Sequence, residues 1–233
     1  MAQQVEEQLA QELWGAISTE FQSRMMADRR LARLSSKVSK GIASYKDVGT
    51  IAQRVGNHSA KALKKVLTAD AVPGGIMSWN VAEKTVGRQA RLQYDLISET
   101  ALTVQKTLNQ KAGLGLRAVV GDFDEDNIRE ILGRLSSGES LKDLAWILDD
   151  PIVRNALSVA DSAIRANADL DRKAGMKPTV TRIAEFNACP WCEDLAGTYD
   201  YADVRDKGND VWRRHNNCRC EILYDPGDSR YGR

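Results

Sequence analysis

The cysteines of this 233-residue chain are confined to one stretch near the C-terminus, between positions 189 and 220. Cys189 and Cys192 form a C-x-x-C pair, and Cys218 and Cys220 form a second pair that His215 precedes by three residues. Two such pairs at separate points of a chain are typical of a zinc site, in which four ligands surround the ion as a tetrahedron. The spacing therefore predicts one Zn²⁺ ion bound by four of these five side chains.

The sequence leaves three other uses of the cysteines open. Two disulfides would also consume four thiols, and C-x-x-C occurs as a redox motif in thioredoxin-like βαβ folds, although no such pattern surrounds this one. A Cys–His nucleophile pair would need an orienting group and an oxyanion loop, and neither is evident. The N-terminus lacks the basic and apolar regions of a signal peptide, so we expect synthesis in a reducing cytosol, which favours a metal over disulfides.

The predicted ion is structural, because a closed site of four ligands has no position for a reacting water. It would supply folding free energy that a small module lacks, on the order of 10 kcal/mol for such sites. Residues 179–186 alternate in polarity before the first pair, and residues 220–224 form a matching strand after the second. The sequence therefore predicts a zinc-knuckle-like β-hairpin module over residues 176–227, followed by a loose tail at 228–233.

Upstream of the module, apolar residues recur at helical spacing and predict long helices over the N-terminal two-thirds of the chain. Residues 4–39 indicate one helix with a single apolar stripe, for which packing inside this chain is favoured over binding another protein. A break at residues 72–75 precedes a second long helix that runs from about 78 to 111, and His58 is expected at a helix start. The stripe consists of Val5, Leu9, Leu13, Ile17, Phe21 and Met25.

Shorter helices are expected after the second long one. The acidic run 122–126, Ser140 and Asp150-Pro151 each suit a helix N-terminus, and the last of these helices reaches about Lys173. The expected fold class is therefore mainly α with a small C-terminal Cys/His-stapled β-hairpin. The expected domains are a helical domain at 1–175, with a sub-boundary near 72–78, and the module at 176–227.

A series of motifs stands in one order between about residue 160 and residue 228. They are Asn167-Ala168-Asp169-Leu170, Ala174-Gly175, Arg182, Cys189-x-Trp191-Cys192, Leu195-Ala196-Gly197-x-Tyr199-x-Tyr201, Val211-x-Arg213-Arg214-His215, Cys218-Arg219-Cys220 and Tyr224-x-Pro226-Gly227. In this combination the region resembles the C-terminal half of the minor capsid, or head-morphogenesis, proteins of tailed bacteriophages, a group related to the Mu protein F-like family. The resemblance does not extend to the first 150 residues.

The resemblance implies a structural minor component of a phage head, associated during head assembly with the portal and the inside of the capsid. It implies that the partners are the portal protein, the major capsid protein or both, and that the protein is made in the host bacterial cytoplasm and ends in the virion. We expect no enzymatic activity and no small-molecule substrate. The sequence contains no Gly-rich phosphate loop, Gly-x-Ser-x-Gly turn or paired-carboxylate motif that would indicate one.

Charge patterning supports a hypothesis from a different class. The net charge is only +1, yet residues 24–65 hold eleven Lys or Arg side chains against Asp28 and Asp47. This basic segment suits DNA, including packaged DNA, or an acidic protein surface, and it also suits a solvated helix face. The alternative function is therefore a DNA-binding protein with a structural zinc module, and a cysteine-dependent enzyme is a third alternative.

A basic and aromatic run lies beside the second cysteine pair. Its side chains could contact a carboxylate patch on a partner, because arginine suits bidentate contacts. The interpretation that we favour is pairing inside the module, with Asp194, Asp206 or Asp210 as acceptors for Arg213 and Arg214. No apolar run approaches the ~18 residues of a membrane helix, so no membrane partner is expected. The candidate partner-binding residues are Trp212, Arg213, Arg214 and Arg219.

Overall fold

The structure is a computed structural model and describes residues 2–207 and 210–227 of the chain. It is 69% helical and carries a small antiparallel sheet near the C-terminus, with the Cys/His cluster nearby, so the predicted fold class is confirmed. The tail at 228–233, predicted to be loose, lies outside the described residues.

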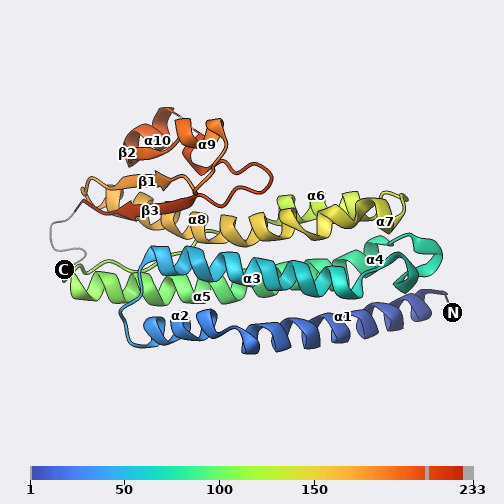
Figure 1. Cartoon of the computed structure of the whole chain (residues 1–233). Coiled ribbons are helices and arrows are strands. Elements are labelled where there is room, and N and C mark those ends of the chain that lie inside the picture. The colour runs from blue at the N-terminus through green and yellow to red at the C-terminus, as the bar shows by residue number, and fades with distance from the viewer. Residues whose placement is uncertain (1, 208–209, 228–233) are drawn as a thin grey trace. The chain divides into compact units, whose positions relative to one another are not determined.

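Long helices fill the chain up to the predicted module (Figure 1). The second long helix begins where the sequence predicted, but it contains a π-helical turn, η3 (Glu83–Gly87), between α4 (Trp79–Ala82) and α5 (Arg88–Lys111). The Ser78 hydroxyl caps its start by accepting a hydrogen bond from the Val81 amide at 3.3 Å. The other α-helices before the module are α1 (Ala2–Ala27), α2 (Arg29–Ser39), α3 (Tyr45–Val66), α6 (Glu125–Leu135), α7 (Leu141–Leu144) and α8 (Asp150–Lys173). Short 3₁₀ turns connect some of them: η1 (Ala69–Ala71), η2 (Pro73–Gly75) and η4 (Ala145–Leu148).

The predicted single helix over residues 4–39 is wrong, because the chain breaks at Asp28 between α1 and α2. Asp28 Oδ1 accepts hydrogen bonds from the amides of Arg30 and Leu31, both at 3.0 Å, and so caps the start of α2. Although burial alone would raise its pKa, hydrogen bonds from Arg54, Leu31 and His58 hold the pKa of Asp28 well below its usual range. The carboxylate therefore stays charged and fixes the break.

His58 was predicted at a helix start, and this is wrong, because it lies inside α3. Its Nε2 is 2.7 Å from Asp28 Oδ2, and Arg54 Nε, one helical turn before it, is 2.5 Å from the same oxygen. The predicted apolar stripe of α1 is buried at Leu13, Ile17 and Phe21 and half-buried at Leu9 and Met25, so packing within the chain is its use along most of its length.

The chain forms two compact units, and each is assembled from three separate stretches. These units do not coincide with the predicted domains, which divided the chain near residue 175. The reason is that α3, α5 and α8 each have one part in the first unit and the other part in the second. The first unit comprises Met1–Ala32, Gln53–Asp95 and Phe123–Ala156, and the second comprises Arg33–Ala52, Leu96–Asp122 and Leu157–Arg233. The predicted module therefore shares its unit with segments of four helices.

The sheet has the strand order β2-β1-β3, and all pairs are antiparallel. The predicted pairing of the strands that flank the cysteines is confirmed: β1 (Thr179–Ile183) pairs with β3 (Glu221–Asp225), with Arg182 opposite Ile222. A strand that was not predicted, β2 (Gly197–Asp200), adds to the other edge of β1. Between the strands stand the short helices α9 (Pro190–Asp194) and α10 (Tyr201–Lys207) and the 3₁₀ turn η5 (Asp210–Trp212).

A buried polar network in the second unit joins the sheet to helical segments. Gln105 Oε1 accepts hydrogen bonds from the hydroxyls of Tyr45 at 2.7 Å and Tyr224 at 2.8 Å, and the two rings meet edge to face. Asn167 Nδ2 donates to the Tyr45 hydroxyl at 3.2 Å. Asp171 is 2% exposed and lies beside the Tyr224 hydroxyl, and burial raises its pKa to about 6.

Replacing Asp171 by asparagine is expected to stabilise the protein at pH 7.5 and to leave it unchanged near pH 4. The folded state binds this proton more tightly than the unfolded chain, whose pKa is near 3.8, so the stability that it contributes is lost as pH rises from about 4 to about 6. After allowance for relaxation we expect a gain of about 1–2 kcal/mol at pH 7.5. Thermal unfolding at both pH values tests this, with the exposed Asp122→Asn as the control, and a lower melting temperature for Asp171→Asn at pH 7.5 would contradict it.

Candidate metal centre

All five predicted ligands meet at the end of β1. Their donor atoms form two groups, Cys189 with Cys192 and His215, and Cys192 with Cys218 and Cys220, and within each group the atoms lie within 4.8 Å of one another. Cys192, Cys218 and Cys220 are buried and Cys189 is half-buried, packed with Ala188 and Trp191. Cys192 belongs to both groups and is the centre of the cluster. These Cys/His groups can hold a metal ion.

Three of the distances between donor atoms are close to those found around a four-coordinate ion. Cys192 Sγ is 3.8 Å from Cys218 Sγ and 3.0 Å from His215 Nε2, and Cys189 Sγ is 3.2 Å from the same nitrogen. Zinc bond lengths in a tetrahedron place two thiolates about 3.8 Å apart, and a thiolate and an imidazole nitrogen about 3.6 Å apart. The two groups would have to move closer together to bind one ion, because the donor atoms lie within 4.8 Å of one another in sets of three and not in a set of four.

Two tight turns present the ligands. Cys189 stands immediately before α9 with Pro190 at the first helical position, and the Cys192 amide donates to the Cys189 carbonyl at 2.9 Å, so one turn carries both thiols. In the second turn the Cys218 amide donates to the His215 carbonyl at 3.1 Å, and Asn217 adopts a φ of 60°. Asparagine tolerates that left-handed conformation better than most residues do.

All four thiols are free, with no disulfide in the part of the chain that the structure describes. Burial raises the pKa of the Cys192 thiol to about 12. A metal ion would therefore have to displace the proton of this thiol in order to bind, as metals do at cysteine sites.

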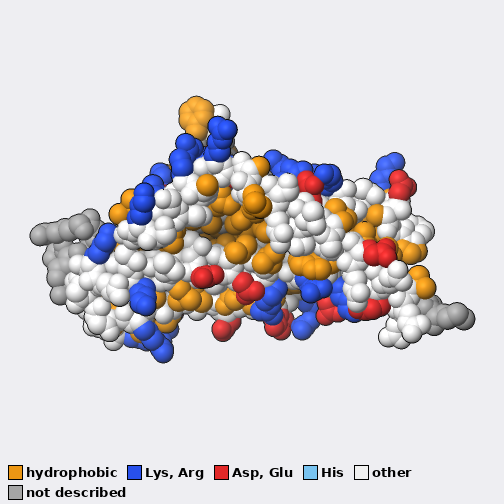
Figure 2. Space-filling model, turned by 90° about the horizontal axis from the view of Figure 1, so that it is seen from below, with side chains coloured by type: hydrophobic (Ala, Val, Ile, Leu, Met, Phe, Trp, Pro, Cys, Tyr) orange, Lys and Arg blue, Asp and Glu red, His pale blue; other side chains and the backbone are white. Residues whose placement is uncertain are grey.

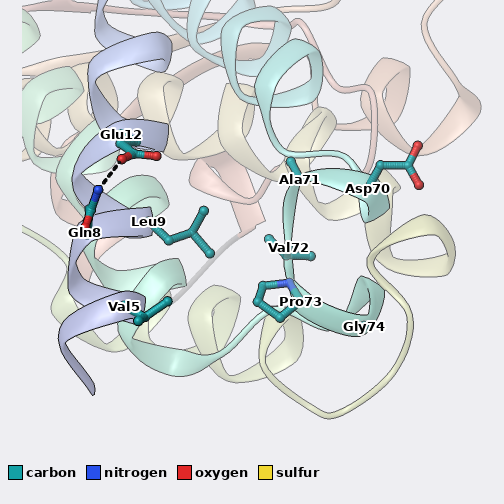
Figure 3. A pocket seen from close by; sticks show the side chains of 9 residues that line it. All are labelled: Val5, Gln8, Leu9, Glu12, Asp70, Ala71, Val72, Pro73 and Gly74. Atoms are coloured by element: carbon teal, nitrogen blue, oxygen red, sulfur yellow. Dashed lines mark hydrogen bonds between the residues drawn. The ribbon is translucent and has the colours of Figure 1, made fainter. Parts of the chain in front are cut away.

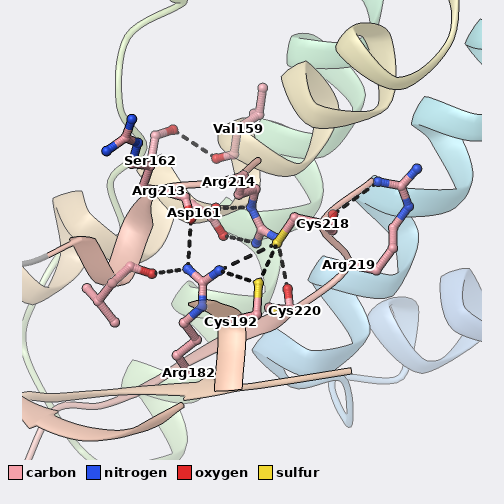
Figure 4. Close-up of polar contacts among 11 residues, drawn as sticks. Val159, Asp161, Ser162, Arg182, Cys192, Arg213, Arg214, Cys218, Arg219 and Cys220 are labelled. Carbon is pink, nitrogen blue, oxygen red and sulfur yellow. Dashed lines mark hydrogen bonds and ion pairs between the residues drawn. The ribbon is translucent and has the colours of Figure 1, made fainter. Parts of the chain in front are cut away.

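Arg182 provides independent support for negative charge at this site (Figure 4). Its side chain is 1% exposed, and Nη2 lies 3.5 Å from both Cys192 Sγ and Cys218 Sγ. Nη1 donates to the carbonyls of Val211 at 2.6 Å and Arg213 at 2.9 Å. A guanidinium buried this deeply is costly unless negative charge lies beside it. Metal-bound thiolates would supply that charge, so the surroundings of Arg182 fit a metal centre.

Arg214 anchors the second ligand pair to α8 (Figure 4). Its Nε and Nη2 donate to the two carboxylate oxygens of Asp161 at 2.6 and 2.8 Å, and Nη1 donates to the Cys220 carbonyl at 2.8 Å. Both side chains of the pair are buried. Asp161 was not among the predicted acceptors, because it lies in α8, outside the module in which the partner was sought. The sequence signal that could have identified Asp161 is its position on the buried face of a helix, because a buried carboxylate requires a basic partner.

The candidate partner-binding residues occupy different environments. Arg214 is buried in its ion pair, so its guanidinium is not available at the surface. Arg213 is exposed, whereas Trp212 is half-buried beneath the Arg165 guanidinium, which lies 5.6 Å from the ring centroid. Arg219 is half-buried and donates to the Cys218 carbonyl at 3.0 Å. Arg213 is thus the member of this set that the structure places at the surface.

The basic segment 24–65 is partly neutralised within the chain. Acidic and basic side chains also lie close together in several places on the face drawn in Figure 2. In α2, by contrast, Arg29, Arg30 and Arg33 are exposed, and no ion pair is recorded for them among the described residues. The paired residues are Arg24 and Lys65 with Glu20, Lys37 with Asp47, Lys46 with Glu221, Arg54 with Asp28, and Lys64 with Asp149.

Comparisons with protein-family models, curated proteins and solved structures found no match to this chain. Within the residues that the structure describes, no helix is both long enough and apolar enough to cross a lipid bilayer.

Proposed function

We propose that the protein is a structural minor component of a tailed-phage head, associated with the portal and the capsid interior during head assembly. The proposal begins from the sequence resemblance. The observation that carries it further is that the residues of the resembling motifs have specific structural roles around the Cys/His cluster. Arg182 faces two thiols, Arg214 joins the cluster to α8, and Tyr224 enters the buried network.

Other motif residues shape the path of the chain into the module. Asn167 bonds both the amide and the carbonyl of Val119, at 3.1 and 2.7 Å, and so holds the extended segment after α5. Gly175 ends α8 with a φ of 86°, the left-handed conformation that glycine adopts at helix ends. Gly227 also has a positive φ, and any side chain there would collide with the Lys177 backbone. These motif residues therefore hold the chain of the second compact unit in its fold, which supports a structural role.

We propose Zn²⁺ as the metal, bound by Cys189, Cys192, His215 and Cys218. Thiolate and imidazole donors in a tetrahedron are the usual ligands of structural zinc. Three thiolates and Zn²⁺ carry a net charge of −1, which the buried Arg182 would balance. A fourth thiolate in place of the imidazole would add negative charge that Arg182 does not balance. Cys218 is chosen over Cys220 because its Sγ lies 3.8 Å from Cys192 Sγ, the separation that a shared ion requires.

The role in the phage head predicts that the protein is present in virions or assembly intermediates. Deleting residues 176–227 is expected to lower the yield of infectious particles without stopping DNA replication, because the partner-binding structure is lost and replication does not use it. Mass spectrometry of purified particles and intermediates tests the location, with the Asp122→Asn protein as the matched control for particle yield. Absence from both fractions, with the protein free in the infected cell, would contradict the proposal.

A DNA-binding role is the second candidate, and the exposed Arg29, Arg30 and Arg33 of α2 favour it. Binding through these residues would neutralise phosphates and would weaken steeply with salt. A gel shift of duplex DNA that is lost in the triple Arg→Gln variant would support this candidate over the structural one.

A further inference from the structure

Two stretches of the second compact unit carry basic side chains and no carboxylate. One is residues 33–46, from α2 to the start of α3, and the other is residues 100–121, in α5 and the segment after it. Their basic residues are Arg33, Lys37, Lys40, Lys46, Lys106, Lys111 and Arg117. The two stretches are far apart in the sequence, and the structure brings them together.

The turn after α2 packs directly against α5. Gly41 lies so close to that helix that a Cβ atom on it would be 3.1 Å from Thr107 Cγ2. Its φ of 65° is a left-handed conformation that glycine adopts at little cost, and it directs the chain onto α5. Lys40 and Lys106 are the sequence neighbours of these two residues, so both lysines lie at the junction of the two stretches.

Hydrogen bonds hold the segment after α5 against the end of that helix. Asn109 Nδ2 donates to the Leu116 carbonyl at 3.0 Å, and the Leu114 amide donates to the Asn109 carbonyl at 2.9 Å. Both bonds fold the chain back onto the last turn of α5. Arg117 is therefore held near the end of the helix, where Lys111 stands.

Five of the seven basic side chains are exposed and have no ion pair recorded among the residues that the structure describes. The other two are neutralised within the chain, Lys37 by Asp47 at 2.9 Å and Lys46 by Glu221 at 3.2 Å. The unit thus presents a surface with positive charge that the chain does not pair. We call it the basic face, and its members are Arg33, Lys40, Lys106, Lys111 and Arg117.

The open groove of the first compact unit has a different character. It lies between α1 and residues 70–74, and the residues that line it include no lysine or arginine. The Asp70 carboxylate points away from it (Figure 3). The groove therefore offers no site for an anionic partner, whereas the basic face does.

The surroundings of the basic face favour the phosphates of a duplex over other anions. Tyr45 is the one aromatic residue in Arg33–Ala52 and Leu96–Asp122, and it is buried, so these stretches offer no ring on which the bases of a single strand could stack. Ile42 is their one exposed large apolar side chain, whereas a bilayer surface or a hydrophobic protein interface would use more apolar area. Three of the five basic side chains are lysines, which contact phosphates as point charges and do not make bidentate contacts with base edges.

We propose that the basic face binds the phosphate backbone of duplex nucleic acid without reading its sequence. α2 and α5 would each place basic side chains against phosphates, and binding would release the counterions of the duplex. The inference rests on the second candidate function and deepens it, because it adds the end of α5 and the segment after it to the exposed arginines of α2.

Fluorescence anisotropy with the full-length protein and a labelled duplex of about 20 base pairs tests the proposal. Five phosphate contacts predict that the logarithm of the binding constant falls with the logarithm of salt concentration with a slope of about −4.5. Lys106→Gln with Lys111→Gln should make this slope shallower by about 2 and weaken binding about tenfold at about 50 mM salt. A second duplex of unrelated sequence should bind equally well.

Lys61→Gln with Lys142→Gln is the matched control, because it removes two exposed lysines from the first compact unit and should leave both the slope and the affinity unchanged. Binding that the α5 variant leaves unchanged, while Arg29→Gln with Arg30→Gln abolishes it, would overturn the basic face but keep the second candidate function. No binding of either duplex at about 50 mM salt would overturn both. Tighter binding to vesicles of phosphatidylserine and phosphatidylcholine than to the duplex would also overturn the proposal, because the partner would then be a lipid surface.

Discussion

Replacing Cys192 by serine is expected to abolish metal binding and to unfold residues 178–226. Cys192 is the one ligand that belongs to both groups of donor atoms, so its loss leaves neither group complete. A structural ion contributes on the order of 10 kcal/mol to the folding of small metal-binding modules. The long helices should persist, because their buried apolar faces do not contact the ion.

Circular dichroism and limited proteolysis measure this outcome. The helical signal should be retained while new cleavage sites appear between residues 178 and 226. Cys220→Ser is the matched control, because the proposed ligand set leaves Cys220 outside the coordination shell, and this variant should retain the metal. A Cys192→Ser protein that still binds one equivalent of metal would refute the account of the site, and metal loss in Cys220→Ser would show that the fourth ligand is Cys220.

Asp161→Asn is expected to destabilise the second compact unit by about 3–5 kcal/mol, because it leaves Arg214 buried without its charge partner. The pair is bidentate and its two side chains are 6% and 9% exposed, so solvent screens it little. The pKa of Arg214 is raised, since Asp161 more than offsets its burial. The variant removes that effect of Asp161, but an arginine guanidinium is not deprotonated in proteins, so Arg214 cannot escape the cost by losing its proton.

The double variant Asp161→Leu with Arg214→Met distinguishes two effects on the free energy of unfolding. One is the cost of leaving a single charge buried without its partner, and the other is the net contribution of the ion pair. Replacing a buried ion pair by apolar side chains of similar size is often neutral or stabilising, so we expect the double variant to be far more stable than Asp161→Asn. Chemical denaturation of the three proteins measures the free energies of unfolding. A loss below about 1 kcal/mol for Asp161→Asn would mean that the pair is solvated, contrary to the observed burial.

Much of the helical fold was predictable, because apolar residues spaced by three and four repeat along it. Ile17 and Phe21 are buried as their positions in the stripe predict. The break at Asp28 was missed although the stripe shifts phase there. The sequence alone does not distinguish a capping aspartate from any other aspartate. Only the structure shows that the Asp28 carboxylate accepts hydrogen bonds from the amides of Arg30 and Leu31. Strand β2 was also missed, because Gly197–Asp200 is too short to show an alternating pattern.

The cluster itself was predictable from ligand chemistry, whereas its supporting residues were not. Thiol and imidazole ligands at paired spacing indicate a metal wherever the fold places them. Arg182 appeared in the sequence only as part of a resemblance, and nothing local shows that its guanidinium faces two thiols. Its contacts, like the pair of Arg214 with Asp161, join positions far apart in the chain and depend on how α8 packs with the module.

The proposed structural zinc ion of the Cys/His cluster can be tested on the purified protein. Elemental analysis combined with zinc X-ray absorption spectroscopy of the reduced, purified protein tests it most directly, because the spectrum reports ligand type, number and distance. We expect about one equivalent of zinc, with three sulfur ligands at about 2.3 Å and one nitrogen ligand at about 2.0 Å. A protein without metal whose four thiols all react freely, or a zinc ion bound mainly by oxygen, would contradict it.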